Sequence, residues 1–385
     1  MSLAPESFIE LGEVIETVMG QAPPGDACNK EGAGMIFVKA GEFQARFPMV
    51  REWTTKPLKI AKPGDALVCV VGATAGKVNL SNLECAIGRS VAAVRARAKQ
   101  LDPQYLFHFL QTKVERLRAG SQGAAQGVIT REMIESLSLY LPPLPEQRRI
   151  AAILDQADAL RAKRREALAQ LDSLTQSIFI EMFGVPGRRS KGWPAKSLEG
   201  VALEINDCPH STPIWTDGGF ICLRTSNLAV GEWNWNDTRY VSEATFHDRS
   251  KRGYVEPGDI VLSREGTVGI AAKVQSGMRL CMGQRLVQVR PNVASVLPDY
   301  LLRHLLFVLS PSRIGQFMVG STSQHLNVKE LRTLPIPVPP LALQDSFGKS
   351  MSTIQALRGK HESALTELDA LFASLQHRAF AGQLS

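Results

Sequence analysis

Residues 142–184 read PPLPEQRRIAAILDQADALRAKRREALAQLDSLTQSIFIEMFG. The two prolines end whatever precedes them, Pro145 suits the first turn of a helix, and Glu146 places a negative charge near the positive helix end. The steps of three and four between apolar residues, and the stop at Gly184, predict one helix of about 36 residues, roughly 50 Å long, with an apolar stripe. The stripe consists of Ile150, Leu154, Ala157, Leu160, Leu168, Leu171, Leu174 and Ile178.

A stripe of that length needs a partner helix, and the other end of the chain supplies one. Residues 339–382 read PPLALQDSFGKSMSTIQALRGKHESALTELDALFASLQHRAFAG. Shifted by 197 residues, the first stretch aligns with the second without a gap up to Phe380. The prolines, Gln147 with Gln344, and the polar break at Arg164 with His361 keep this register. We therefore predict two equivalent helices that pair antiparallel, in preference to two unrelated amphipathic helices.

The rest of the chain also repeats. Residues 1–141 show short strand patterns at 36–39, 66–71, 90–94 and 137–141, a helical pattern at 103–118 and a polar loop at 119–130. In residues 185–338, a Pro-Gly-Asp turn at 257–259 matches the one at 63–65, each before an apolar strand. Before position 60 the alignment is looser, and we suggest only that Val38-Lys39 corresponds to Leu223-Arg224. We predict an α+β chain with an internal pseudo-two-fold repeat: mixed α/β domains at 1–141 and 185–338, and long helices at 142–184 and 339–385 forming a coiled coil.

The composition excludes few classes of function. The chain has 385 residues and a net charge of +7, which permits nucleic-acid binding without requiring it. Its six cysteines form no CxxC pair and no Cys/His metal spacing, so we expect buried thiols in a reducing compartment. Neither a signal peptide nor an apolar run long enough to span a membrane is recognisable, and we expect a cytoplasmic protein.

The sequence matches no catalytic motif. Residues 72–77, GATAGK, resemble a phosphate loop but have three residues between the glycines where four are required, so a strand-end turn is the better interpretation. The LPPL at 141–144 lacks the Asn and the aromatic residue of the NPP[FY] motif of adenine methyltransferases. No GxGxxG follows a strand pattern. We expect no catalytic site, no cofactor and no metal.

The whole pattern resembles the specificity subunit of a Type I restriction-modification system. The resemblance rests on residues 141–184, on the Pro-Gly-Asp turns and on GSTSQHLN at 320–327, and it covers essentially the whole chain. The chain departs from it at PPLALQ, which lacks the Pro-Glu of the first helix, and at GSQGAAQG, which lacks a Ser-Thr-Ser run.

The resemblance implies a non-catalytic subunit that binds double-stranded DNA. Each mixed domain would be a target-recognition domain for one half of a split, asymmetric site, and the helix pair would fix the spacer. The implied partners are two methyltransferase subunits that use S-adenosylmethionine and, in a complete complex, ATP-driven restriction/translocase subunits. Apolar faces around Ile150 and Phe347 could seat the methyltransferases, although the helix pair could equally bury them.

Candidate DNA contacts are side chains in loops or at strand ends that bind phosphates or base edges well. In the first domain they are Lys39, Lys77, Arg89, Gln122, Gln126 and Arg131. In the second they are Arg224, Asn227, Arg264, Gln284, Arg285, Ser323, Gln324 and His325. Three alternatives stay open: a self-contained DNA enzyme, a coiled-coil scaffold without DNA readout, and a subunit of a methylation-only system.

Overall fold

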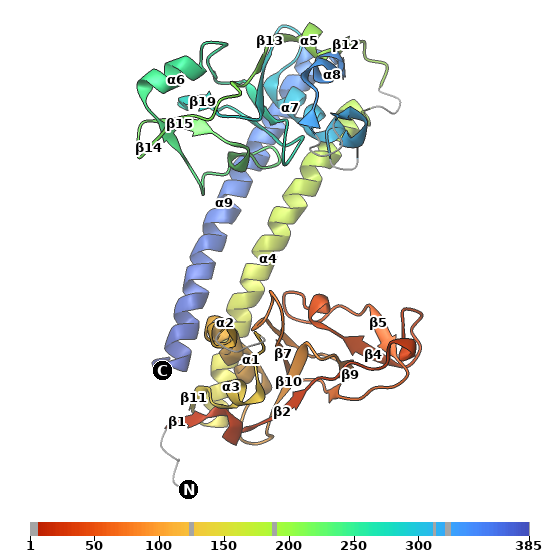
Figure 1. The fold of residues 1–385 in the computed structure, drawn as a ribbon, viewed down its shortest axis with the longest axis vertical. Coiled ribbons are helices and arrows are strands. Elements are labelled where there is room, and N and C mark those ends of the chain that lie inside the picture. Colours follow the sequence, from red (N-terminus) through yellow and green to blue (C-terminus); the bar gives the residue numbers. More distant parts are fainter. Residues whose placement is uncertain (1–6, 123–126, 187–190, 311–312, 320–324, 385) are drawn as a thin grey trace. The chain divides into compact units, whose positions relative to one another are not determined.

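A computed structural model describes residues 7–122, 127–186, 191–310, 313–319 and 325–384. The chain forms two compact units (Figure 1). Unit 1 comprises residues 1–166 and 362–385, and unit 2 comprises residues 167–361. Each unit therefore contains one mixed domain and parts of both long helices, so this division differs from the domain boundaries predicted above, which stay a proposal.

The two long helices are α4 (Leu144–Phe183) and α9 (Leu341–Phe380), each of 40 residues. They are longer than the predicted 36 because each begins directly after its second proline. In unit 1 the start of α4 runs beside the end of α9, since Arg149 donates to the Leu384 carbonyl while Arg161 contacts Asp369 further along. In unit 2, Phe179 and Phe183 near the end of α4 contact Phe347 near the start of α9. The predicted antiparallel pairing is thus confirmed within each unit.

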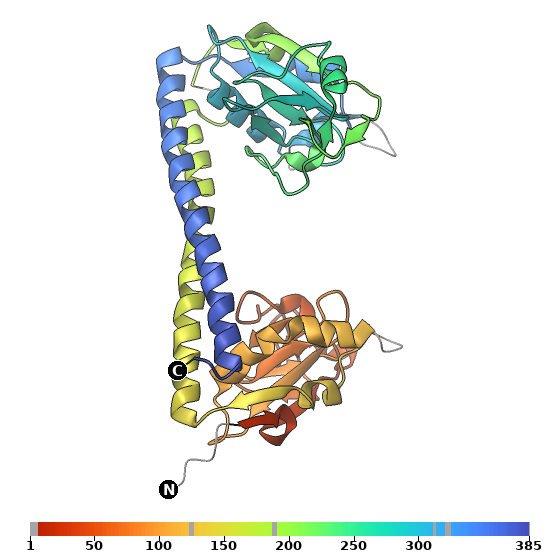
Figure 2. The same ribbon diagram turned by 90° about the vertical axis from the view of Figure 1, so that its left-hand side faces the viewer.

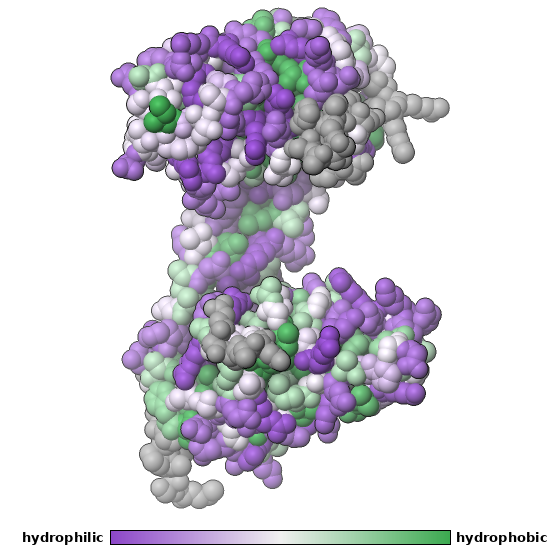
Figure 3. Space-filling model, in the orientation of Figure 1, coloured by the Kyte–Doolittle hydropathy of each residue, from purple (hydrophilic) through white to green (hydrophobic). Residues whose placement is uncertain are grey.

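The predicted stripe is only partly buried, which corrects the sequence analysis. Ile150, Leu154 and Ala157 are in the core of unit 1. Four leucines, by contrast, are 43–51% exposed, and they form two equivalent pairs at the 197-residue shift: Leu160 with Leu357, and Leu174 with Leu371. Figure 3 shows hydrophobic surface on the helices between hydrophilic side chains. In unit 2 the deeply buried residues of α4 are Phe179 and Phe183.

Unit 1 contains two main sheets. One has the order β2-β10-β7-β8 and contains β2 (Ile15–Met19), β10 (Val91–Ala96), β7 (Ala66–Cys69) and β8 (Val78–Leu80). The other has the order β3-β5-β4-β9-β6 and contains β3 (Cys28–Asn29), β5 (Glu52–Thr54), β4 (Met35–Val38), β9 (Cys85–Ile87) and β6 (Ile60–Ala61). A ribbon of β1 (Ser7–Glu10) and β11 (Ser138–Leu141) precedes α4.

Unit 2 repeats this plan. One sheet has the order β13-β20-β17-β18 and contains β13 (Ala202–Asp207), β20 (Leu286–Pro291), β17 (Ile260–Ser263) and β18 (Ala271–Lys273). The other has the order β14-β16-β15-β19 and contains β14 (Trp215–Thr216), β16 (Tyr240–Val241), β15 (Phe220–Leu223) and β19 (Leu280–Met282). Smaller ribbons pair β12 (Ala195–Ser197) with β23 (Pro335–Pro337) and β21 (Met318–Val319) with β22 (His325–Leu326).

Helices cover one face of the first sheet in each unit, and the second sheet covers the other face. In unit 1, α1 (Pro103–Thr112) packs on β7, β8 and β10 (Figure 2), and α2 (Val114–Gln122) and α3 (Arg131–Glu135) follow it. In unit 2, α7 (Pro298–Val308) packs on β18, while α5 (Leu198–Val201), α6 (Glu243–Arg249) and α8 (Val328–Thr333) are peripheral. Alternate residues of one strand therefore enter different cores: Ile260 and Leu262 face the helices, whereas Val261 faces the second sheet.

Several predicted boundaries need correction in unit 1. The helix predicted at 103–118 is two helices, because Lys113 ends α1 and α2 begins at Val114. The polar loop predicted from position 119 begins later, since α2 continues to Gln122. The Gly72–Gly76 segment is a turn after β7, as predicted, with both glycines in the left-handed region at φ +87° and +86°.

A buried glutamine anchors the start of each long helix in the same way. Gln147 accepts a hydrogen bond from the Asp102 amide and donates to the carbonyls of Gln100 and Pro142. Gln344 accepts one from the Leu297 amide and donates to Ser295 and Pro339. Both glutamines are at most 1% exposed. The repeat read from the sequence therefore extends to individual hydrogen bonds.

Candidate nucleic-acid interface

In each unit a pair of parallel strands ends at one edge of the second sheet. β4 pairs with β9 through Val38 and Ile87, and β15 pairs with β19 through Leu223 and Met282. Parallel strands bring their carboxyl ends to the same edge, so the turns that follow them are neighbours. The Gly283 amide donates to the Leu223 carbonyl at 2.8 Å, and a Cβ at Gly283 would lie only 2.3 Å from that oxygen. We call this region the paired-turn edge: residues 39–42 and 88–90 in unit 1, and 224–227 and 283–285 in unit 2.

The first turn of this edge is a 3-10 turn in both units, at a shift of 185 residues. Lys39 precedes η3 (Ala40–Glu42) and Arg224 precedes η4 (Thr225–Asn227). The third residue of each turn caps the first: a Glu42 carboxylate oxygen accepts the Lys39 amide, and the Asn227 side-chain oxygen accepts the Arg224 amide. The suggested correspondence of Lys39 with Arg224 is therefore confirmed.

Asn227 has a different place from the one expected of a DNA contact. Its side chain is fully buried, and its amide group donates to the carbonyls of Asn234 and Asp237. Those bonds fix the loop that follows the turn. The structure thus favours a positioning role for Asn227 over direct DNA contact.

Of the other described candidates of unit 1, Lys39 and Arg89 lie at the paired-turn edge, and Lys77 and Arg131 lie elsewhere. Lys39 forms an ion pair with Glu52 at 2.7 Å, and Arg89 is exposed in the second turn. Lys77 donates to the Phe43 carbonyl just after η3, and it lines an open hollow of about 620 Å³ together with Arg118 and Arg161. Arg131 is exposed at the start of α3. Lys39 and Arg89 are thus brought together, whereas Lys77 and Arg131 lie on other segments.

The unit 2 candidates converge more closely. Arg264 makes two hydrogen bonds from one nitrogen to the Asp207 carboxylate, at 2.8 and 2.7 Å, and its amide donates to the Arg285 carbonyl. Arg285 is exposed, contacts Glu265 at 3.2 Å and has a φ of +67°, which is uncommon for a residue with a side chain. Gln284 donates to the His210 carbonyl. Arg264, Gln284 and Arg285 therefore form one cluster beside Arg224.

Some candidates cannot be placed in full. Gln126, Ser323 and Gln324 lie outside the described residues. Gln122 is the last residue of α2, and His325 is the first residue of β22, where it pairs with Val319. The Leu326 amide donates to the Arg264 carbonyl, which brings the backbone of β22 to the cluster.

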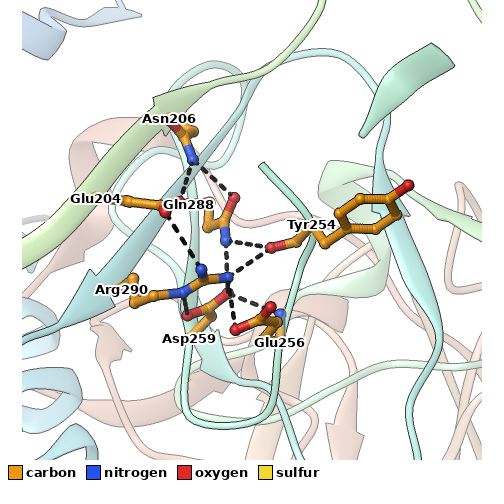
Figure 4. Close-up of polar contacts among 7 residues, drawn as sticks. All are labelled: Glu204, Asn206, Tyr254, Glu256, Asp259, Gln288 and Arg290. Atoms are coloured by element: carbon orange, nitrogen blue, oxygen red, sulfur yellow. Dashed lines mark hydrogen bonds and ion pairs between the residues drawn. The ribbon is translucent and has the colours of Figure 1, made fainter. Parts of the chain in front are cut away.

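At the other end of the first-sheet strands, the aspartate of each Pro-Gly-Asp turn holds an arginine of the neighbouring strand, β10 or β20. Asp259 accepts two hydrogen bonds from Arg290 and one from Gln288 (Figure 4). Asp65 accepts two from Arg95. These aspartates are at most 3% exposed in their side chains. Hydrogen bonding to Asp259 raises the pKa of Arg290, and hydrogen bonding to Asp65 raises the pKa of Arg95. The motif therefore fixes the turn rather than offering a catalytic acid.

Sequence reasoning missed the anions of the interface. Glu52, Asp237, Asp207 and Glu265 each contact a predicted cation, although no carboxylate is among the predicted DNA contacts. A signal was present in two cases, because Glu52 and Asp237 each follow their cation by thirteen residues. Of the two alternatives given for Ile150 and Phe347, burial is the one that the structure shows, since these residues are at most 1% exposed.

The described part of the chain contains no group of three or more His, Cys, Asp or Glu side chains arranged to hold a metal ion. None of its helices combines the length and the apolar character needed to cross a membrane. All six cysteines are free thiols, five of them buried.

The fold is that of solved specificity subunits. The crystal structure of the S subunit of a type I restriction-modification system from M. genitalium aligns with 99% of this chain and 98% of its own, at a TM-score of 0.61 and 15% identity. A second solved chain, from work on complex assembly and conformational transition of the type I R-M system, aligns over the full length of both chains at a TM-score of 0.58 and 19% identity.

Sequence comparison assigns the family. The family described as "Type I restriction modification DNA specificity domain" matches residues 6–170 and 191–367, and the chain belongs to this family. The EcoKI specificity subunit of Escherichia coli is 24% identical over 335 residues, 78% of this chain and 70% of that protein. A putative MjaX specificity subunit of Methanocaldococcus jannaschii is 32% identical over 173 residues, 44% of this chain and 40% of that protein.

Proposed function

We propose that this chain reads a split DNA site, each unit recognising one half through its paired-turn edge. The observation that carries the proposal is the repetition of one arrangement in two dissimilar sequences: a cation before a 3-10 turn, beside the turn that ends a parallel strand. Arg, Lys and Gln side chains at such turns suit phosphates and base edges. Because the side chains differ between the units, the two half-sites would differ in sequence.

The helix pair would fix the spacer between the half-sites. The reciprocal ion pairs Arg161–Asp369 and Arg358–Asp172 occupy equivalent repeat positions, which supports a pairing register shared by both units. Adding one seven-residue repeat to each helix is expected to lengthen the spacer without changing either half-site. An unchanged spacer, measured by sequencing the bound DNA, would refute this role.

Catalysis would belong to partners. We propose that two methyltransferase subunits dock on the helix pair, with restriction/translocase subunits joining in a complete complex. The exposed pairs Leu160 with Leu371 in unit 1 and Leu174 with Leu357 in unit 2 are the better seats, since Ile150 and Phe347 are buried. In unit 2, Leu174 also lines a hollow of about 500 Å³ on the helix surface. Methyl transfer or cleavage by the purified chain alone would instead support a self-contained enzyme.

The test of DNA readout is a pair of matched substitutions. Arg285→Ala is expected to weaken recognition of one half-site and to spare the other, because Arg285 belongs to unit 2 and its side chain is exposed there. Arg89→Ala in unit 1 is the matched control and should affect the opposite half-site. Binding of random duplex DNA followed by sequencing measures both halves at once. Equal loss at both halves for either variant would contradict the assignment, and absence of any DNA binding would favour a scaffold.

A further inference from the structure

Both cations that open the paired-turn edge are held by a carboxylate thirteen residues further along. Lys39 Nζ lies 2.7 Å from Glu52 Oε2, and one terminal guanidinium nitrogen of Arg224 lies 2.5 Å from Asp237 Oδ2. The residue types differ between the units, but the charges, the spacing and the place in the fold are the same. These are therefore equivalent ion pairs rather than a chance contact in one unit.

In neither ion pair are the charges fully removed from water. The side chains of Lys39 and Glu52 are 40% and 22% exposed, and those of Arg224 and Asp237 are 32% and 56% exposed. Exposed ion pairs contribute little to folding stability, because water screens them. The turn itself is already fixed by the capping side chains of Glu42 and Asn227. A role in stability thus accounts poorly for the pair appearing twice.

The pair does have a consequence for a polyanion. A carboxylate beside a cation competes with DNA phosphates for it, and it also restricts the directions in which the cation can donate. The carboxylate therefore weakens phosphate contacts to DNA of every sequence, while it orients the donor for one site. Together these effects increase the difference in binding free energy between the right and the wrong site. The cations of the unit 2 cluster are held in the same manner, Arg264 by Asp207 and Arg285 by Glu265.

We propose that Glu52 and Asp237 are specificity-determining residues, which restrain Lys39 and Arg224 so that each unit discriminates its half-site against bulk DNA. The inference rests on the DNA-reading function proposed above and deepens it. It assigns the carboxylates a positioning role: they act on DNA through the neighbouring cation. In unit 2, Arg239 lies 4.0 Å from Asp237 as a second cation, so loss of Asp237 releases two positive charges where loss of Glu52 releases one.

The experiment uses the full chain and a pool of random-sequence duplex DNA, with total binding measured over a series of salt concentrations and the bound DNA sequenced. Glu52→Gln is expected to flatten the preference in one half of the selected site, and Asp237→Asn in the other half. Each should raise binding to the unselected pool by about two- to five-fold at low salt. Asp237→Asn should have the larger effect on total binding.

Matched controls remove one charge from an exposed ion pair elsewhere in the same unit. Glu115→Gln removes the partner of Arg118 in unit 1, and Asp248→Asn removes the partner of Lys251 in unit 2. Both controls should leave the selected site unchanged. The exchange Lys39→Glu with Glu52→Lys rebuilds the ion pair with its charges reversed. It should keep the fold but lose the half-site, whereas a merely structural pair would be rescued by the exchange.

The outcomes separate the two proposals. If the wild-type chain selects a split site and neither Glu52→Gln nor Asp237→Asn alters its half, the restraint is refuted and the DNA-reading function stands. If the exchange variant retains the half-site, the restraint is refuted as well. If the wild-type chain selects no sequence, the proposed function fails, and the inference fails with it.

Discussion

In both units the aspartate of the Pro-Gly-Asp turn binds an arginine, but the number of carboxylates around that arginine differs between the units. In unit 1, Arg95 faces Asp65 and Glu16. In unit 2, Arg290 faces Asp259, Glu204 and Glu256, and it also donates to the Tyr254 carbonyl (Figure 4). The comparison shows that a repeat can keep one buried contact while the surface residues around it diverge. It also predicts where equivalent substitutions should have unequal effects.

The largest effect is expected for removal of the arginine that the Pro-Gly-Asp aspartate binds. Arg290→Met should lower the free energy of unfolding of unit 2 by about 3–5 kcal/mol, because it leaves three carboxylates close together, one of them buried. Arg95→Met leaves only two and should cost unit 1 roughly 2–3 kcal/mol. Urea unfolding followed by tryptophan fluorescence reports mainly on unit 2, which holds four of the five tryptophans. Amide hydrogen exchange reports on unit 1. Equal losses would mean that the extra carboxylate of unit 2 has no effect on stability.

The second prediction uses a buried histidine that only unit 2 has at its position. His304 in α7 is surrounded by Phe179, Tyr300 and other apolar groups, and burial lowers its pKa to about 4, with the nearby Pro335 carbonyl offsetting little of this. The equivalent residue in α1 is Phe109. In the unfolded chain His304 therefore becomes protonated near pH 6.5, whereas in the folded unit it stays neutral down to about pH 4.

Unit 2 should consequently be fully stable above pH 6.5 and lose roughly 3 kcal/mol as the pH falls to about 4. His304→Phe, which copies unit 1, should abolish this pH-dependent loss. The measurement is the urea midpoint of tryptophan fluorescence at a series of pH values. A variant whose stability falls with pH as steeply as that of the wild type would exclude His304 as the cause.

The smallest effect is expected in the helix pair, where the units are most alike. Asp172→Asn removes a partner of Arg358, and Asp369→Asn removes a partner of both Arg161 and Arg165. Because the carboxylates of Asp172 and Asp369 are 66% and 42% exposed, each substitution should cost less than about 1 kcal/mol, with Asp369→Asn the larger. Thermal unfolding at low and high salt measures the difference. A loss of several kcal/mol from either would show that the helix pair depends on charge rather than on its apolar contacts.

Much of this fold could be predicted because its signals are local. The helix starts, the Pro-Gly-Asp turns and the glutamine equivalence of Gln147 with Gln344 are all visible as spacing in the chain. The interface could be predicted only in part. Lys39, Arg224 and Arg285 were found as cations at strand ends, but Asn227 could not be recognised as buried, because burial depends on residues distant in sequence. The stripe leucines were misassigned for the same reason, since a forty-residue helix contacts different partners along its length.

By itself, the sequence determined that the chain is an internal repeat. It also determined that each copy of the repeat has a mixed domain and a long helix, and that the two helices pair. Period and turn chemistry encode these features, because they act over a few neighbouring residues. Only the tertiary structure decided which leucines stay exposed, which carboxylate pairs with which cation, and which polar side chain is buried and hydrogen-bonded within a loop. Those outcomes depend on contacts between segments far apart in the chain, and residue order alone does not specify such contacts.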